Sequence, residues 1–138
     1  MSTTYSADPI ATVEQFKKAL LSVRDSSLPQ AHLSMLQAQC QTHDHSITAT
    51  KLAEAAGYEN FNAANLQYGT LASKVAKHIG FTPELRKDGS PHWWTTLSYA
   101  NIGITDPDSG HFLFIMRPEL VQALKEMKWV KTPTADFS

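Results

Sequence analysis

A short alanine-rich stretch between Thr48 and Gly57 constrains the fold of this chain more than any other feature. Thr48 is suited to cap the first turn of a helix, and Ile47 just before it can act as a hydrophobic staple. Gly57 follows at the helix end, where the backbone of one residue often takes the left-handed conformation. Glycine adopts this conformation without strain. We therefore expect a helix over 49–56 that stops after about two turns and must pack against a neighbour.

A longer helix is expected directly afterwards, capped by Asn62 and closed by Gly80. Two helices joined by a tight turn form a helix–turn–helix, which needs a small residue where the helices touch, and Ala53 supplies it. The remaining apolar contacts are expected from Leu52, Ala56, Tyr58, Ala63 and Leu66. Short alanine-rich helices followed by glycine also occur in other helical proteins, so a purely structural helix pair is the alternative.

The other elements follow from hydrophobic spacing and residue type. Apolar residues at helical spacing predict helices, whereas aromatic and β-branched residues predict strands. The stretch 101–110 is rich in Gly, Asp and Pro and is expected to be a long hairpin loop. In chain order, we expect helices over 13–24, 29–40, 49–56 and 62–78, strands over 93–98 and 111–117, and a helix over 118–128.

This order of elements is that of a winged-helix domain with an N-terminal helical addition. A length of 138 residues favours one domain, and 42% hydrophobic residues supply a core. We predict a mainly α fold with a small antiparallel β-hairpin, in the α+β class, as one winged-helix-like domain over 12–130. A flexible N-terminal arm is expected over 1–11, and a C-terminal tail over 131–138.

Charge and cysteine content narrow the functional classes. Twelve Lys and Arg against thirteen Asp and Glu give a net charge of -1, which argues against coating nucleic acid non-specifically or binding a membrane surface. The single cysteine, Cys40, excludes an internal disulfide and is expected to pack as a small apolar residue. The N-terminus has no signal-peptide pattern and the apolar runs are short, so a cytoplasmic protein is expected.

The polar face of the helix over 62–78 predicts binding to double-stranded DNA. Asparagine can form paired hydrogen bonds with the edge of adenine, and the hydroxyls of Ser and Thr can donate or accept hydrogen bonds. Lysine can neutralise the charge of a phosphate. The segment 60–87 contains four Lys and Arg residues and one Glu, so its local net charge is +3. The residues expected to contact DNA are Asn62, Asn65, Thr70, Ser73, Lys74, Lys77, Arg86 and Lys87. A local charge of +3 gives only weak binding to DNA, so a homodimer or a partner protein is expected to contribute to the affinity. The alternative is that these polar residues form an ordinary solvated helix face and contact no DNA.

The adjacent residues Trp93 and Trp94 offer a second contact. In a strand they point to opposite faces, so one enters the core and the other is available to a base or a partner protein. Packing against the last helix or the N-terminal helices is the alternative. An exposed tryptophan, or the face around Leu66, would anchor the runner-up function, a protein–protein interaction module on a winged-helix scaffold.

No motif in the chain predicts catalysis. The pair His43 and His45 could chelate a metal if it lay in a strand, but the sequence places no third ligand beside it. Gly-rich phosphate loops, nucleophile elbows, His-Glu-x-x-His motifs and His-Asn-His nuclease patterns are absent from the sequence. We expect no catalytic residue, no metal site and no cofactor, and therefore a protein that is not an enzyme.

The stretch from Ile47 to Tyr58, followed by 65–72, resembles a segment of bacterial proteins, some of which also carry an HNH endonuclease domain. In those proteins the same phrase precedes a Trp-Trp strand, as at 93–97 here, and an Arg-Pro-Glu-Leu helix start, as at 117–120. The resemblance covers residues 12–130. It implies a helix–turn–helix-like module linked to defence or mobile-element DNA transactions, with the nuclease supplied elsewhere, and it carries over no functional residues.

Overall fold

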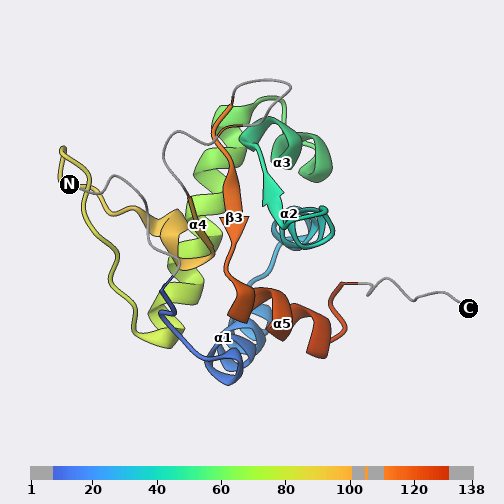
Figure 1. Ribbon diagram of the computed structural model, residues 1–138, viewed down its shortest axis with the longest axis vertical. Coiled ribbons are helices and arrows are strands. Elements are labelled where there is room, and N and C mark those ends of the chain that lie inside the picture. The colour runs from blue at the N-terminus through green and yellow to red at the C-terminus, as the bar shows by residue number, and fades with distance from the viewer. Residues whose placement is uncertain (1–7, 101–104, 106–110, 131–138) are drawn as a thin grey trace, which may run out of the picture.

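The computed structural model describes residues 8–100, 105 and 111–130. It confirms a mainly helical fold with a small antiparallel sheet (Figure 1). The helices are α1 (Val13–Ser26), α2 (Gln30–Cys40), α3 (Ala49–Ala56), α4 (Phe61–Ile79) and α5 (Pro118–Glu126), with a 3₁₀ helix η1 (Trp93–Thr96). The strands are β1 (Ser46–Ile47), β2 (Ser98–Tyr99) and β3 (Phe114–Met116). None of the helices in the described ranges is long and apolar enough to cross a membrane.

Side-chain caps and glycines define most helix ends. Thr12 and Gln15 form a reciprocal capping box at the start of α1, with hydrogen bonds of 3.1 and 2.8 Å. The Thr48 hydroxyl accepts from the Lys51 amide at the start of α3, and Gly57 ends that helix with a φ of 81°, as expected. These local signals therefore placed α3, its Thr48 cap and its Gly57 end correctly in the chain.

The predicted start of α4 is wrong by two residues. Asn60, not Asn62, caps the helix, because its side-chain oxygen accepts from the Ala63 amide at 3.0 Å. The turn is tight because the Tyr58 amide already donates to the Ala53 carbonyl at 2.9 Å. Asn62 consequently lies in the first turn of α4, where its side chain is exposed.

The predicted strand over 93–98 is also wrong in its first part. Residues 93–96 form η1, in which both the backbone amide and the hydroxyl of Thr95 donate to the His92 carbonyl, at 3.0 and 2.7 Å. A side chain that bonds to nearby backbone competes with a strand ladder, which explains the helical turn despite the β-forming composition. The strand β2 begins only at Ser98, and the predicted loop over 101–110 lies outside the described residues except Thr105, which bridges to Phe112.

The sheet contains a strand that the sequence did not predict. The sequence predicts no strand between the helices over 29–40 and 49–56, but Ser46 and Ile47 pair as β1 with β3, the strand predicted over 111–117. Both outer strands pair antiparallel with β3, which gives the order β1-β3-β2. The returning strand is shorter than predicted, at Phe114–Met116, and α5 ends at Glu126 rather than near 128.

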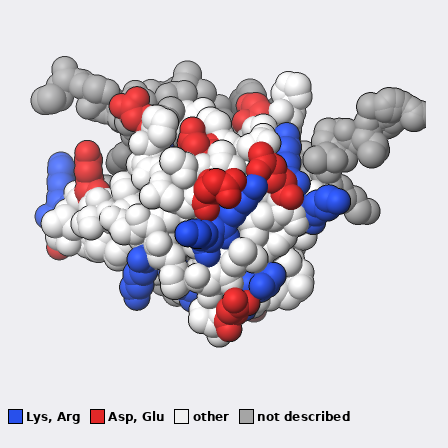
Figure 2. Space-filling model, turned by 90° about the horizontal axis from the view of Figure 1, so that it is seen from below, with Lys and Arg blue, Asp and Glu red and all other residues white. Residues whose placement is uncertain are grey.

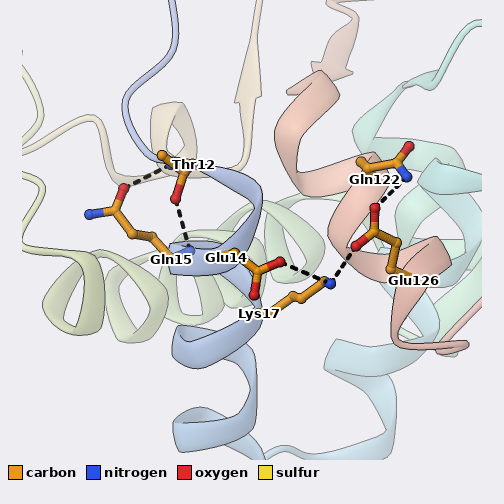
Figure 3. A network of polar contacts seen from close by, with 6 residues as sticks. All are labelled: Thr12, Glu14, Gln15, Lys17, Gln122 and Glu126. Atoms are coloured by element: carbon orange, nitrogen blue, oxygen red, sulfur yellow. Dashed lines mark hydrogen bonds and ion pairs between the residues drawn. The ribbon is translucent and has the colours of Figure 1, made fainter.

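A surface network joins the first and last helices (Figure 3). The Lys17 ammonium on α1 contacts Glu14 at 3.1 Å and also reaches Glu126 on α5, which accepts from the Gln122 amide at 2.6 Å. Exposed ion pairs contribute little to the free energy of folding. The apolar contacts beneath this network therefore hold α5 in place. Phe16 and Leu20 of α1 and Leu120 and Leu124 of α5 are fully buried there.

A buried hydrogen-bond cluster holds α2, α4 and the sheet together. The Tyr68 hydroxyl on α4 donates to the side-chain oxygen of Gln39 on α2, at 2.6 Å, and lies 2.6 Å from the Ser98 hydroxyl on β2. The Gln39 amide completes the cluster by donating to Ser98 at 2.9 Å and to the Phe114 carbonyl at 3.0 Å. Desolvation raises the pKa of Tyr68 well above its ordinary value, so its hydroxyl keeps its proton.

Removing the Tyr68 hydroxyl is expected to destabilise the fold. In Tyr68→Phe the side-chain oxygen of Gln39 loses its donor while it remains buried, which costs about 1–3 kcal/mol. Urea unfolding followed by circular dichroism measures this loss. Tyr58→Phe is the control, because the hydroxyl of half-buried Tyr58 makes no hydrogen bond to any described residue. Equal stability of Tyr68→Phe and the wild type would contradict the structural role of the cluster.

Candidate functional site

A groove with a volume of about 760 Å³ runs along the exposed face of α4. It lies between this helix, η1 and the segment that leads into β3, and the first residues of α3 also contribute to its lining. Helix α4 supplies Phe61, Asn65, Leu66, Tyr68, Gly69, Thr70 and Ser73. The other lining residues are Ala49, Thr50, Arg86, Pro91, Trp93, Trp94, His111, Phe112 and Phe114.

Aromatic rings form much of the groove wall. Trp94 packs edge-to-face on Phe112 and Phe114, with ring centroids 5.5 and 5.3 Å apart. Trp93 is half-buried, and no described residue forms a ring contact with it. Because residues 93–96 form a turn of helix rather than a strand, both tryptophans line the same groove instead of facing opposite sides.

A buried arginine fixes the position of η1. Arg117 is 3% exposed, and its guanidinium donates to the Thr95 carbonyl at 2.8 Å and to the Asp8 carbonyl at 3.0 Å. Its backbone amide donates to the Leu97 carbonyl at 3.0 Å. Hydrogen bonds donated by the charged guanidinium are stronger than those between neutral groups. The 3₁₀ helix that carries the two tryptophans is therefore firmly held beside β3.

The polar groups of α4 differ in what they can offer a ligand. The Thr70 hydroxyl donates to the Leu66 carbonyl at 3.0 Å, and the Ser73 hydroxyl donates to the Thr70 carbonyl at 2.8 Å. Their protons are therefore engaged, and their oxygens serve a ligand as acceptors. Asn65 is exposed, and its side chain makes no hydrogen bond to a described residue, so its amide offers both donors and acceptors.

Among the described residues that line the groove, Arg86 is the only Lys or Arg, and none is Asp or Glu. A tight turn positions it: its backbone amide donates to the Ser90 carbonyl at 2.7 Å, and its guanidinium donates to the Pro91 carbonyl at 3.2 Å. Asp88 in the same turn accepts from the backbone and hydroxyl of Ser90, and the hydroxyl bond is the main reason why its pKa is lowered. The groove therefore combines apolar walls with a fixed positive charge.

The structure brings together six of the residues proposed from the sequence as contacts. Asn65, Thr70, Ser73, Arg86, Trp93 and Trp94 all line the groove. The other four do not line it. Asn62, Lys77 and Lys87 are exposed elsewhere, and the Lys74 ammonium donates to the Ser27 carbonyl at the end of α1, at 3.2 Å.

Sequence reasoning named Leu66 as a possible anchor for a partner protein but missed Phe61 and Phe112. Phe61, Leu66 and Phe112 are 49%, 68% and 40% exposed and all line the groove. The signal for Leu66 was that it interrupts an otherwise polar helix face. The contribution of His111 and Phe112 depends on how a distant segment folds against α4, so no local pattern points to it.

The paired histidines at 43 and 45 do not form part of this groove. Within the part of the chain that the structure describes, no three His, Cys, Asp or Glu side chains are grouped to hold a metal ion. His45 has a φ of 64°, and its carbonyl accepts from the Met116 amide at 2.8 Å. Its backbone therefore helps to join the segment before β1 to β3.

Comparison of the chain with protein families, with curated proteins and with solved structures found no match. The resemblance to segments of HNH-associated bacterial proteins therefore stays a prediction.

Stability is expected to fall as the pH decreases through the range where histidine titrates. Desolvation, with a smaller effect of Lys125, lowers the pKa of His45, while Asp44 opposes the shift. The unfolded chain therefore takes up a proton first, near an ordinary pKa of about 6.5, and acid favours unfolding until the folded state also protonates. We expect the urea midpoint to fall between about pH 7.5 and about pH 5.5, and to fall less in His45→Asn, since Asn tolerates a positive φ.

His43→Asn is the matched control for this experiment. His43 lies two residues away and is exposed, so its replacement is expected to keep the wild-type pH dependence. An identical decrease in His45→Asn and the wild type would show that the half-buried imidazole of His45 does not cause it.

Proposed function

We propose that this protein is a DNA-binding module and that the groove along α4 is its contact surface. The observation that carries the proposal is the convergence of polar side chains, aromatic rings and Arg86 on this groove, with no carboxylate among its lining residues in the described ranges. Such a surface suits an anionic ligand with flat, apolar rings, and a nucleotide combines both properties. Catalysis is not part of the proposal.

The arrangement of elements supports this function. The segment from α2 to β3 contains a helix, a strand, a helix–turn–helix and two further strands, with the strand order β1-β3-β2. We interpret this as a winged-helix arrangement in which α4 takes the place of the recognition helix. In helix–turn–helix proteins the second helix contacts base edges, and the exposed side of α4 carries the groove.

Phosphate contacts contribute less than the sequence suggested. Lys74 is directed to the Ser27 carbonyl, and Lys77 and Lys87 lie outside the groove. The face shown in Figure 2 carries interspersed positive and negative side chains rather than a continuous basic surface. Affinity is therefore expected to depend on contacts inside the groove more than on the overall charge.

Binding of a partner protein is the second candidate function. Three of the large apolar side chains that are exposed in the described ranges, Phe61, Leu66 and Phe112, lie in this groove. Clustered exposed apolar residues are typical of protein-binding surfaces. This function predicts an apolar segment of a partner in the groove, held without a requirement for negative charge.

A carboxylate introduced into the groove is expected to weaken DNA binding. Asn65→Asp keeps the shape of the side chain and places a negative charge beside the proposed ligand, whereas Asn62→Asp adds the same charge to α4 outside the groove. We expect Asn65→Asp to reduce affinity by about tenfold or more and Asn62→Asp by less than about threefold. Fluorescence anisotropy of labelled DNA at low salt measures both.

Two outcomes would contradict this function. Equal effects of the two substitutions would show that net charge, not the groove, governs binding. Absence of binding to both duplex and single-stranded DNA at low salt would exclude the proposal and favour the partner-protein function. The partner-protein function is tested with Leu66→Lys. This substitution removes the most exposed apolar side chain among the described groove residues and is expected to abolish binding of an apolar partner.

A further inference from the structure

The charge of the groove is too small for a surface that binds duplex DNA through its phosphates. Proteins that do so neutralise about six to ten phosphates with Lys and Arg. Of the lining residues in the described part of the chain, Arg86 is the only one of these two types. A ligand that fits this groove must gain most of its affinity from contacts other than ion pairs.

The two tryptophans have different roles in the groove wall. Trp94 is packed edge-to-face against Phe112, Phe114 and His92, so it forms part of a rigid wall. Trp93 is half-buried, lines the groove and makes no ring contact with a described residue. Trp93 also packs against the hydrophobic core, and the part of its indole that borders the groove is open to stacking by the flat face of a nucleobase.

Bases inside a regular duplex stack on each other and present only their edges. The aromatic wall of a groove can reach a base face only when the base is unpaired. The groove volume of about 760 Å³ lies in the range of pockets that enclose a small molecule, about 300–1,000 Å³. The groove is therefore large enough for a nucleotide that has left the base stack.

The polar groups around Trp93 match the other parts of a nucleotide. Arg86 is held by its bonds to Ser90 and Pro91 and supplies a fixed positive charge for a phosphate. Asn65 across the groove on α4 has unused donors and acceptors for a base edge. Among the lining residues that the structure describes, none carries a carboxylate that would repel the phosphate.

We propose that the groove holds unpaired nucleotides of a single strand, with a base stacked on Trp93 and a phosphate bound by Arg86. This inference rests on the proposed function and specifies its ligand. The same chemistry is present in single-stranded DNA and in RNA, so the experiment includes both.

The test compares labelled oligodeoxythymidine, oligouridine and a DNA duplex, each of about 12 nucleotides per strand, by fluorescence anisotropy with the full chain. We expect at least one of the single strands to bind about tenfold more tightly than the duplex. The tighter of the two single strands identifies the strand as DNA or RNA. This comparison uses the wild type, so its result does not depend on whether a variant folds.

Substitutions then assign the contacts. Trp93→Ala is expected to weaken single-strand binding by about tenfold, and Trp93→Phe to restore most of it, because a phenyl ring also stacks. Arg86→Gln is expected to weaken binding and to reduce its salt dependence, whereas Lys87→Gln, one residue outside the groove, changes both little. Trp129→Phe is the control for tryptophan replacement, since Trp129 does not line the groove.

Duplex binding as tight as single-strand binding would overturn the inference, and so would full affinity in Trp93→Ala. If duplex DNA still binds and remains sensitive to Asn65→Asp, the proposed function stands without this specification. If oligouridine binds and neither form of DNA does, the stacking site stands, and the DNA-binding function is wrong and is replaced by RNA binding. If no nucleic acid binds under any condition, both proposals fail.

Discussion

The position of the groove depends on one buried hydrogen-bond cluster. Tyr68, Gln39 and Ser98 come from α4, α2 and β2, and the Gln39 amide also bonds to the Phe114 carbonyl of β3. Each of these side chains is 0% exposed, so no water can replace a lost partner without reorganisation. Tyr68 and Phe114 also line the groove. The cluster therefore determines where the exposed face of α4 lies relative to the sheet and to the aromatic turn before it.

The helical part of the fold was predictable because its signals are local. Thr12, Thr48, Gly57 and Gly80 act on the backbone within a few residues, and each one ends or caps a helix in the structure. The start of α4 was missed because two asparagines stand close together, and the choice between them depends on how the preceding turn closes. The failures among the strands are of a different kind. β1 has only two residues and exists because β3 pairs with it, so no periodicity within 46–47 could have revealed it.

The part of the candidate site that lies on α4 was predictable, because its signals are also local, whereas the opposite wall was not. Helical spacing placed Asn65, Thr70 and Ser73 on one face of α4, and the structure keeps them together. The lysines were less predictable, because a long side chain that is polar on a helical wheel can still turn to a neighbouring carbonyl, as Lys74 does to Ser27. The opposite wall required knowledge of the tertiary structure. It unites the turn around Arg86, the 3₁₀ helix and the start of β3, and their contact depends on the buried guanidinium of Arg117.

A small number of fixed contacts can take the place of a strongly basic surface. Arg86 is already restrained by Ser90 and Pro91, and the wall around Trp94 is locked by ring packing, so little conformational entropy remains to be lost when a ligand enters. A diffuse basic surface attracts any polyanion and binds more weakly as salt rises, whereas stacking on an aromatic face needs an accessible flat ring in the ligand. In a chain with a net charge of -1, the proposed function relies mainly on the second kind of contact. Under that proposal, the aromatic wall and the restrained arginine supply affinity that the overall charge does not.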